Sequence, residues 1–91
     1  MEFLTTLVLA NALTCQANFG FSKWSAEVDF DSQMMYVIAP NAQAHGMYST
    51  FSKGRETTYF ISYEFGQGAS LTVGPSQTTL CIDTNTCSVC R

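Results

Sequence analysis

The sequence contains few charged residues, and positive charge is the scarcer sign. Only 12% of its 91 residues are aspartate, glutamate, lysine or arginine, whereas soluble globular domains usually contain roughly 25%. Four lysine and arginine residues stand against seven acidic ones, which gives a formal net charge of −3. Proteins that neutralise the phosphates of DNA or RNA carry a clustered basic patch. The composition therefore excludes nucleic acid as an expected partner.

The sequence also lacks an apolar run long enough to cross a bilayer. The apolar segment at residues 3–10 is much shorter than the roughly 20 apolar residues that a spanning helix needs, so we expect no membrane span. Small residues follow it, and both Ala10–Ala12 and Cys15–Ala17 fit the small-x-small pattern of a signal-peptide cleavage site. Glu2, however, stands where a signal peptide usually has lysine or arginine.

Two interpretations of this N-terminal segment remain open. Residues 1–12 are either a secretory signal peptide or an extra N-terminal strand, since residues 5–8 suit a β-strand well. The number of cysteines constrains the first interpretation. Cleavage after Ala12 leaves four cysteines, whereas cleavage after Ala17 removes Cys15 and leaves an odd number. In either case we predict that residues 13–91 form a single β domain.

The remaining sequence has the period of β-strands and shows no extended helical period. In "WSAEVDFD" (residues 24–31) apolar and polar residues alternate, which places one face on a core and the other in water. "KGRE" (residues 53–56) is a hairpin signal in which Gly54 can adopt a positive φ. The fold class that we predict is all-β, a small antiparallel β-sandwich or barrel of about six strands stapled by disulfides. The predicted strands are residues 24–31, 34–39, 46–52, 57–65, 69–73 and 78–82.

Three of the four cysteines lie in the last eleven residues, "CIDTNTCSVCR". A zinc site would need Cys15 or His45 in addition, but zinc ligands usually come in two close pairs and this chain has one. A thioredoxin-like redox motif needs a helix after its CxxC, and none is predicted here. An even number of cysteines in a small β domain favours disulfides.

The cysteine spacing also indicates how the bridges could be arranged. A loop of residues 83–85 would make a hairpin that places Cys81 opposite Cys87. Cys15 would then pair with Cys90 and tie the N-terminal segment to the C-terminus. Four cysteines allow three connectivities, and the sequence does not choose among them.

The sequence offers a weak basis for catalysis. His45 is the only histidine, and a small ribonuclease-like hydrolase could use it with Glu56 or Glu64 as acid and base, with Arg55 stabilising charge. No nucleophile motif or second base accompanies His45, so a solvated loop histidine is the favoured interpretation. We therefore predict no enzyme, no catalytic residue, no cofactor and no metal.

Aromatic residues make up 13% of the chain. Most of them are expected to fill the core of the sandwich, and the remainder are candidates for an exposed surface. Tyr48 and Phe51 fall on opposite faces of their predicted strand, so one of them should be exposed. Exposed rings in a protein with little charge indicate a contact surface for a protein or a carbohydrate. The candidates for this surface are Trp24, Tyr48, Phe51 and Tyr59, and a carbohydrate-binding module using Trp24 or exposed tyrosines is one alternative function.

The chain resembles small secreted cysteine-bridged proteins of filamentous fungi, a group that includes plant-infection effectors and killer-toxin-like proteins with compact β-sandwich folds. It shares with them a short leader before Cys15, the segment "NFGFSKWSAEVDF", tyrosine-rich strands and clustered C-terminal cysteines. The resemblance implies a secreted, disulfide-stabilised binding or virulence-type protein without an active site. Glu2 and the scarcity of lysine and arginine depart from typical members, and they disfavour a membrane-active toxin.

Overall fold

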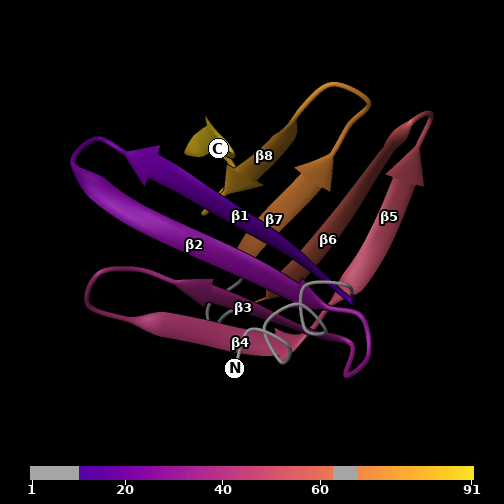
Figure 1. Cartoon of the computed structure of the whole chain (residues 1–91), viewed down its shortest axis with the longest axis horizontal. Helices are drawn as coiled ribbons and strands as arrows, with labels where there is room; N and C mark the ends of the chain where they lie inside the picture. The colour runs from indigo at the N-terminus through magenta and orange to yellow at the C-terminus, as the bar shows by residue number, and fades with distance from the viewer. Residues whose placement is uncertain (1–10, 63–67) are drawn as a thin grey trace.

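The computed structural model describes residues 11–62 and 68–91, which form two antiparallel β-sheets and no helix (Figure 1). The predicted all-β, disulfide-stapled sandwich is therefore confirmed. Over this part of the chain no helix could span a membrane. The strands are β1 (Ala12–Phe19), β2 (Ser22–Asp29), β3 (Met34–Ile38), β4 (Gln43–Met47), β5 (Ser49–Lys53), β6 (Glu56–Ser62), β7 (Gly68–Val73), β8 (Thr78–Cys81) and β9 (Cys87–Val89).

Each sheet is a meander in which every strand pairs with its neighbour in sequence. Sheet A has the order β1-β2-β3-β4, and sheet B has the order β5-β6-β7-β8-β9. Gly20 and Gly54 adopt φ values of 66° and 61° in the turns between β1 and β2 and between β5 and β6. The positive φ that the sequence predicted for Gly54 is therefore present. In Figure 1 the strands of sheet A run across the view, and those of sheet B cross them diagonally.

The described part of the chain has nine strands rather than the predicted six, because one predicted strand is divided in two and β1 and β9 were not predicted. The predicted strand at 46–52 is divided at Tyr48, which is the one residue between β4 and β5 and the point where the chain passes from sheet A to sheet B. The Tyr48 ring meets Phe30 and Tyr59 edge-on, with ring centroids 6.4 and 5.5 Å apart. These edge-on contacts, which we call the aromatic corner, stabilise the bend at Tyr48. The alternation of residues along the strand does not predict this bend. β1, most of β4 and the short β9 were not among the predicted strands.

The core lies between the inner faces of the two sheets. Sheet A contributes mostly small side chains to it, whereas sheet B contributes larger aliphatic ones, including Leu71 and Leu80 at 0% exposure. In β2 the inward residues are Ala26 and Val28, as the alternation in the sequence predicted. The buried residues of the described chain are Cys15, Ala17, Ala26, Val28, Met35, Val37, Ile61, Ala69, Leu71 and Leu80.

Two disulfides hold the C-terminal segment in place, and their pairing is the one that the sequence favoured. Cys15 in β1 bonds to Cys90, with 75 residues of separation, and the Arg91 backbone N–H donates to the Gln16 carbonyl at 2.8 Å beside it. These contacts join sheet A to the end of sheet B, so the C-terminus lies next to β1 in Figure 1. Cys81 and Cys87 face each other across β8 and β9 and form the second bridge.

The loop between β8 and β9 is the predicted one, and its conformation depends on Asp83. The Ile82 backbone N–H donates to the Thr86 carbonyl at 2.9 Å. The Asp83 carboxylate accepts hydrogen bonds from the backbone N–H groups of Asn85 and Thr86, at 2.7 and 2.8 Å. The hydrogen bond from Asn85, supported by those from Thr86, lowers the pKa of Asp83 below its ordinary value of 3.8.

The lowered pKa of Asp83 predicts an acid-sensitive loop. A group whose pKa is lower in the folded state stabilises the fold above its unfolded pKa, and this contribution is lost as the pH falls through the folded value. An NMR titration should therefore show the Asp83 carboxyl titrating below 3.8, and the amide signals of Asn85 and Thr86 should shift with it. The variant D83N keeps a side-chain oxygen acceptor but cannot titrate, so its amide shifts should lose this acid step. A titration at or above 3.8 would contradict the prediction.

Candidate functional site

The four aromatic residues predicted to form a binding surface do not lie together on one outer face. Trp24 is half-buried against the core and meets Phe19 edge-on, with ring centroids 5.7 Å apart. Tyr48 and Tyr59 are half-buried in the aromatic corner between the sheets. Phe51 is 60% exposed on β5. As predicted, one of Tyr48 and Phe51 is exposed, and it is Phe51.

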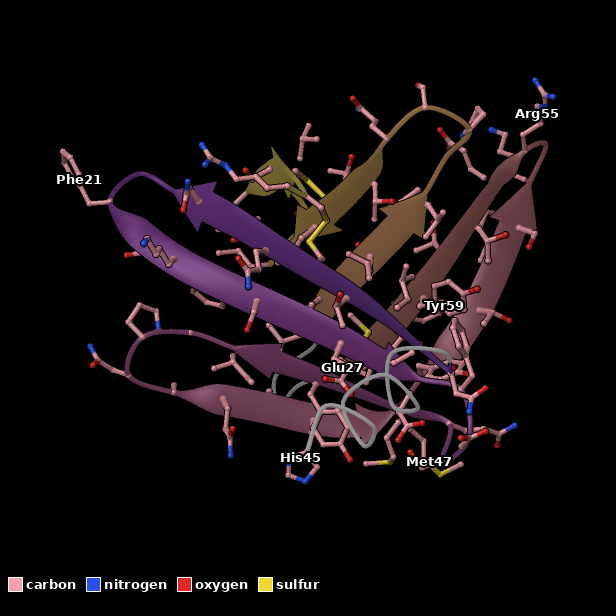
Figure 2. All side chains as sticks on the ribbon, viewed as in Figure 1. Phe21, Glu27, His45, Met47, Arg55 and Tyr59 are labelled. Atoms are coloured by element: carbon pink, nitrogen blue, oxygen red, sulfur yellow. A yellow bond between two sulfur atoms is a disulfide. The ribbon has the colours of Figure 1, made fainter. Side chains whose placement is uncertain are left out.

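Three further phenylalanines of the described chain are exposed and were not among the predicted surface residues: Phe21, Phe30 and Phe60. Phe60 lies on β6 between Tyr59 and the buried Ile61, so the alternation along that strand turns its ring outward. This signal was available in the sequence. Phe21 follows Gly20 at the tip of the hairpin between β1 and β2 and projects from the molecule (Figure 2).

Two neighbouring cross-strand rows on the outer face of sheet B consist of uncharged residues, and we call these two rows the hydroxyl–phenyl face. The next row on the same side pairs Lys53 with Glu56. Residues paired directly across neighbouring strands project to the same side of a sheet. The register therefore aligns the first row as Ser49, Phe60, Ser70, Cys81 and Cys87. It aligns the second row as Phe51, Thr58, Thr72, Thr79 and Val89. No charged residue belongs to either row.

The hydroxyl–phenyl face combines exposed apolar side chains with hydroxyl groups. Phe51, Phe60 and Val89 are exposed by 60%, 37% and 48%. The hydroxyls of Thr58 and Thr72 are hydrogen-bonded to each other at 2.9 Å, which fixes part of the surface between the rings. An open hollow of about 540 Å³ adjoins the first row, and its described lining includes Phe60, Ser70 and Asp83. The face can therefore offer apolar contact together with a few hydrogen-bonding groups.

The outer face of sheet A is more polar and carries the histidine. The register aligns Thr14, Glu27, Tyr36 and His45 in one cross-strand row. The rings of Tyr36 and His45 are stacked, with centroids 5.7 Å apart and planes inclined by 27°. His45 lies on β4, whereas the sequence analysis had placed it in a turn. The row thus brings an imidazole, a phenol and a carboxylate onto one exposed surface.

Of the residues in the hydrolase hypothesis, Arg55 and Glu56 do not lie beside His45. In Figure 2 His45 lies at the lower edge of the molecule and Arg55 at the opposite upper corner. Glu56 begins β6 next to Arg55 and is paired with Lys53 in the same hairpin. Glu64 lies outside the described residues. The acidic side chain that shares a cross-strand row with His45 is Glu27, which the hypothesis did not include.

The cysteines are not available as metal ligands, because all four are bridged and none is free. Within residues 11–62 and 68–91, no three side chains of histidine, cysteine, aspartate or glutamate gather as a metal site would require. Asp29 is engaged in the turn after β2, where its carboxylate accepts the Asp31 N–H at 3.0 Å. Hydrogen bonding, chiefly from Ser32, lowers the pKa of Asp29.

These features define a small two-sheet antiparallel β-protein with two disulfides and two outer faces of contrasting chemistry. Comparisons of the chain with models of protein families, with curated proteins and with solved structures found no match. The function must therefore be argued from the surfaces of this molecule.

Proposed function

We propose that the protein is a secreted, disulfide-stabilised binding protein that has no catalytic activity and contacts a protein partner through the hydroxyl–phenyl face. The observation that carries this proposal is the alignment of ten uncharged residues in two rows across the five strands of sheet B. The proposal includes the effector or virulence-type role that the resemblance to small fungal proteins implies.

The state of the cysteines supports an extracellular location. Both bridges together use every cysteine in the chain. Disulfides persist in oxidising compartments and are rare where glutathione keeps thiols reduced. A domain of this size has a small core and often depends on such bridges for its stability. These arguments are consistent with export.

The chemistry of the hydroxyl–phenyl face supports a protein as the partner. The centres of protein–protein interfaces are depleted in charged residues and enriched in aromatic ones, and truncation of an aromatic anchor commonly costs about 2 kcal/mol or more. Phe51 and Phe60 are exposed phenyl rings on adjacent strands, and the charged groups Lys53, Glu56 and Asp83 border the two rows. This arrangement is that of an apolar patch with a polar rim.

Two alternatives have less support from the structure. A carbohydrate-binding module usually displays an aromatic platform, but Trp24 is packed against Phe19 and the core. A hydrolase would need groups converging on His45, and Arg55 lies at the far end of the molecule from it (Figure 2). By contrast, the packing of the fold does not explain why Phe51 and Phe60 of the hydroxyl–phenyl face are exposed.

The proposal predicts a protein adduct from the hydroxyl–phenyl face. A photoreactive amino acid at Thr72, in the middle of the second row, should crosslink to another protein in extracellular fluid of the culture or tissue that produces the chain. The double variant F51S/F60S should reduce the adduct by about 30-fold or more, because losing an aromatic anchor costs about 2 kcal/mol and 1.4 kcal/mol is tenfold. Mass spectrometry of the adduct measures this effect.

The matched control is I38S, which replaces a 45% exposed apolar residue on the outer face of sheet A and should leave the adduct unchanged. Absence of a protein adduct, or an equal loss with I38S, would overturn the proposal. A different result would favour the carbohydrate-binding alternative over a protein partner. In that result the protein is retained on insoluble chitin, glucan or cellulose, and F51S/F60S abolishes the retention. Loss of biological activity in H45A with the adduct intact would favour the hydrolase.

A further inference from the structure

Both thioethers of sheet A that face outward lie beside the histidine. Met34 in β3 is paired directly with Met47 in β4, and Tyr36 is paired with His45 two residues further along the same strands. Met35 between them is fully buried, so Met34 and Tyr36 project to the outer face. We call Met34, His45 and Met47 the soft-donor cluster.

The exposure of Met47 has no explanation in the packing. Its side chain is 73% exposed, more than any other large apolar residue of the described strands, and it lies on the more polar of the two outer faces. Figure 2 shows Met47 and His45 along the same lower edge of the molecule. Residues two apart on a strand share a face, so the sulfur and the imidazole are directed to the same side.

The distances between paired strands allow the three donors to converge. Directly opposite residues have Cβ atoms about 4.5–5.5 Å apart, and diagonal neighbours about 7–8 Å apart. Methionine has three rotatable bonds, so each sulfur can move over several ångströms at little cost. The stack on Tyr36 restrains the His45 ring, with the ring planes inclined by 27°. Only the two thioethers must move to meet one ion.

The chemistry of this donor set selects a soft ion. Thioether sulfur is a soft ligand that favours Cu(I), whereas carboxylates and water favour hard cations. Cysteine thiolates would compete for such an ion, but all four cysteines are in disulfides. Glu27 lies in the same row as His45, on the strand beyond Tyr36, and adds negative charge near the site. A cation is thus favoured over a neutral or anionic ligand.

We propose that Met34, Met47 and His45 bind one monovalent soft metal ion, Cu(I) or its analogue Ag(I), through two sulfurs and one imidazole nitrogen. The site lies on sheet A and is independent of the partner surface on sheet B. It needs no change in the oxidation state of the ion or of the protein. Failure of the partner-binding experiment would leave it unaffected.

Silver nitrate in a chloride-free buffer is the probe, because Ag(I) needs no reductant and the disulfides stay intact. An NMR titration with the assigned methionine methyl groups should show the Met34 and Met47 signals and the His45 ring signals shifting together and saturating at one ion per chain. The Met35 methyl group, which is buried at 0% exposure, is the internal reference and should stay in place.

The variants M47L and H45N should each weaken Ag(I) binding by about tenfold or more, since even loss of a residue supporting a metal ligand costs about 10–100-fold. The matched control is Q43A, a change on the same strand and face outside the cluster, which should leave the affinity unchanged. Zn(II) should bind much more weakly than Ag(I), because only one donor is nitrogen.

Three outcomes would overturn the site. The first is an absence of shifts at Met34 and Met47 at one equivalent of Ag(I). The second is an affinity that Q43A lowers as much as M47L does. The third is Zn(II) binding that M47L leaves intact, which would indicate a histidine–carboxylate site instead.

Discussion

Replacing Cys15 and Cys90 together by alanine will lower the free energy of unfolding by about 4–5 kcal/mol, because the bridge closes a loop of about 75 residues. In the chain-entropy model the cost grows with the logarithm of the loop length. Small domains have only about 5–15 kcal/mol of total stability, so this variant should be largely unfolded at moderate temperature. Cys15 is also 2% exposed, and its loss leaves part of the core unfilled.

Urea unfolding followed by circular dichroism measures this change, and the variant C81A/C87A is the matched control. Its bridge spans a separation of six residues, so the same relation gives a smaller loss of about 2 kcal/mol. Equal losses from the two pairs would contradict the prediction.

The intact mass before and after reduction counts the bridges, since each reduced bridge adds two hydrogen atoms. An unchanged mass would show that the thiols were never bridged.

Replacing Leu71 by alanine will lower the free energy of unfolding by about 3–4 kcal/mol. Leu71 is fully buried at 0% exposure on the inner face of β7, paired with Tyr59 on one side and Leu80 on the other. Leucine-to-alanine changes in packed cores cost about 2–5 kcal/mol, because the transfer free energy is lost and a cavity remains.

Thermal unfolding by calorimetry gives the change for L71A, with V89A as its surface control. Val89 is 48% exposed on the outer face of β9, and its truncation should change the stability by no more than about 0.5 kcal/mol. A cost for L71A below that of V89A would show that the two sheets do not share a packed core.

Local patterns were sufficient for much of the fold. The alternation of residues 24–31 correctly predicted which side chains of β2 face inward. The favoured bridge between Cys81 and Cys87 depended on a hairpin of three loop residues, and that loop is present. Once Cys81 and Cys87 are paired, Cys15 and Cys90 are the two cysteines that remain, so they pair with each other. Each of these predictions involves residues close in sequence or a simple count.

The outer surfaces could not be predicted in the same way, because they depend on register between strands. Met34 lies beside Met47 only because the turn after β3, closed by the Ala39 N–H donating to the Ala42 carbonyl at 2.8 Å, sets the pairing. A shift of one residue would have moved His45 to the inner face. Trp24 is a different case. The alternation of residues 24–31 already placed it on the core face with Ala26, and the structure shows it half-buried there beside Phe19.

The order of the strands has a consequence for how the protein folds. Within each sheet every strand pairs with the next one in the sequence, so most of the structure can form through consecutive hairpins between residues that are close along the chain. Chains with such local contacts fold faster than β-proteins whose strands pair at long range. The junction of β1 with the C-terminal segment is the exception, because it must wait until both sheets exist. We therefore expect the bridge between Cys15 and Cys90 to close after the hairpins of both sheets have formed, and to supply stability that the reduced chain lacks.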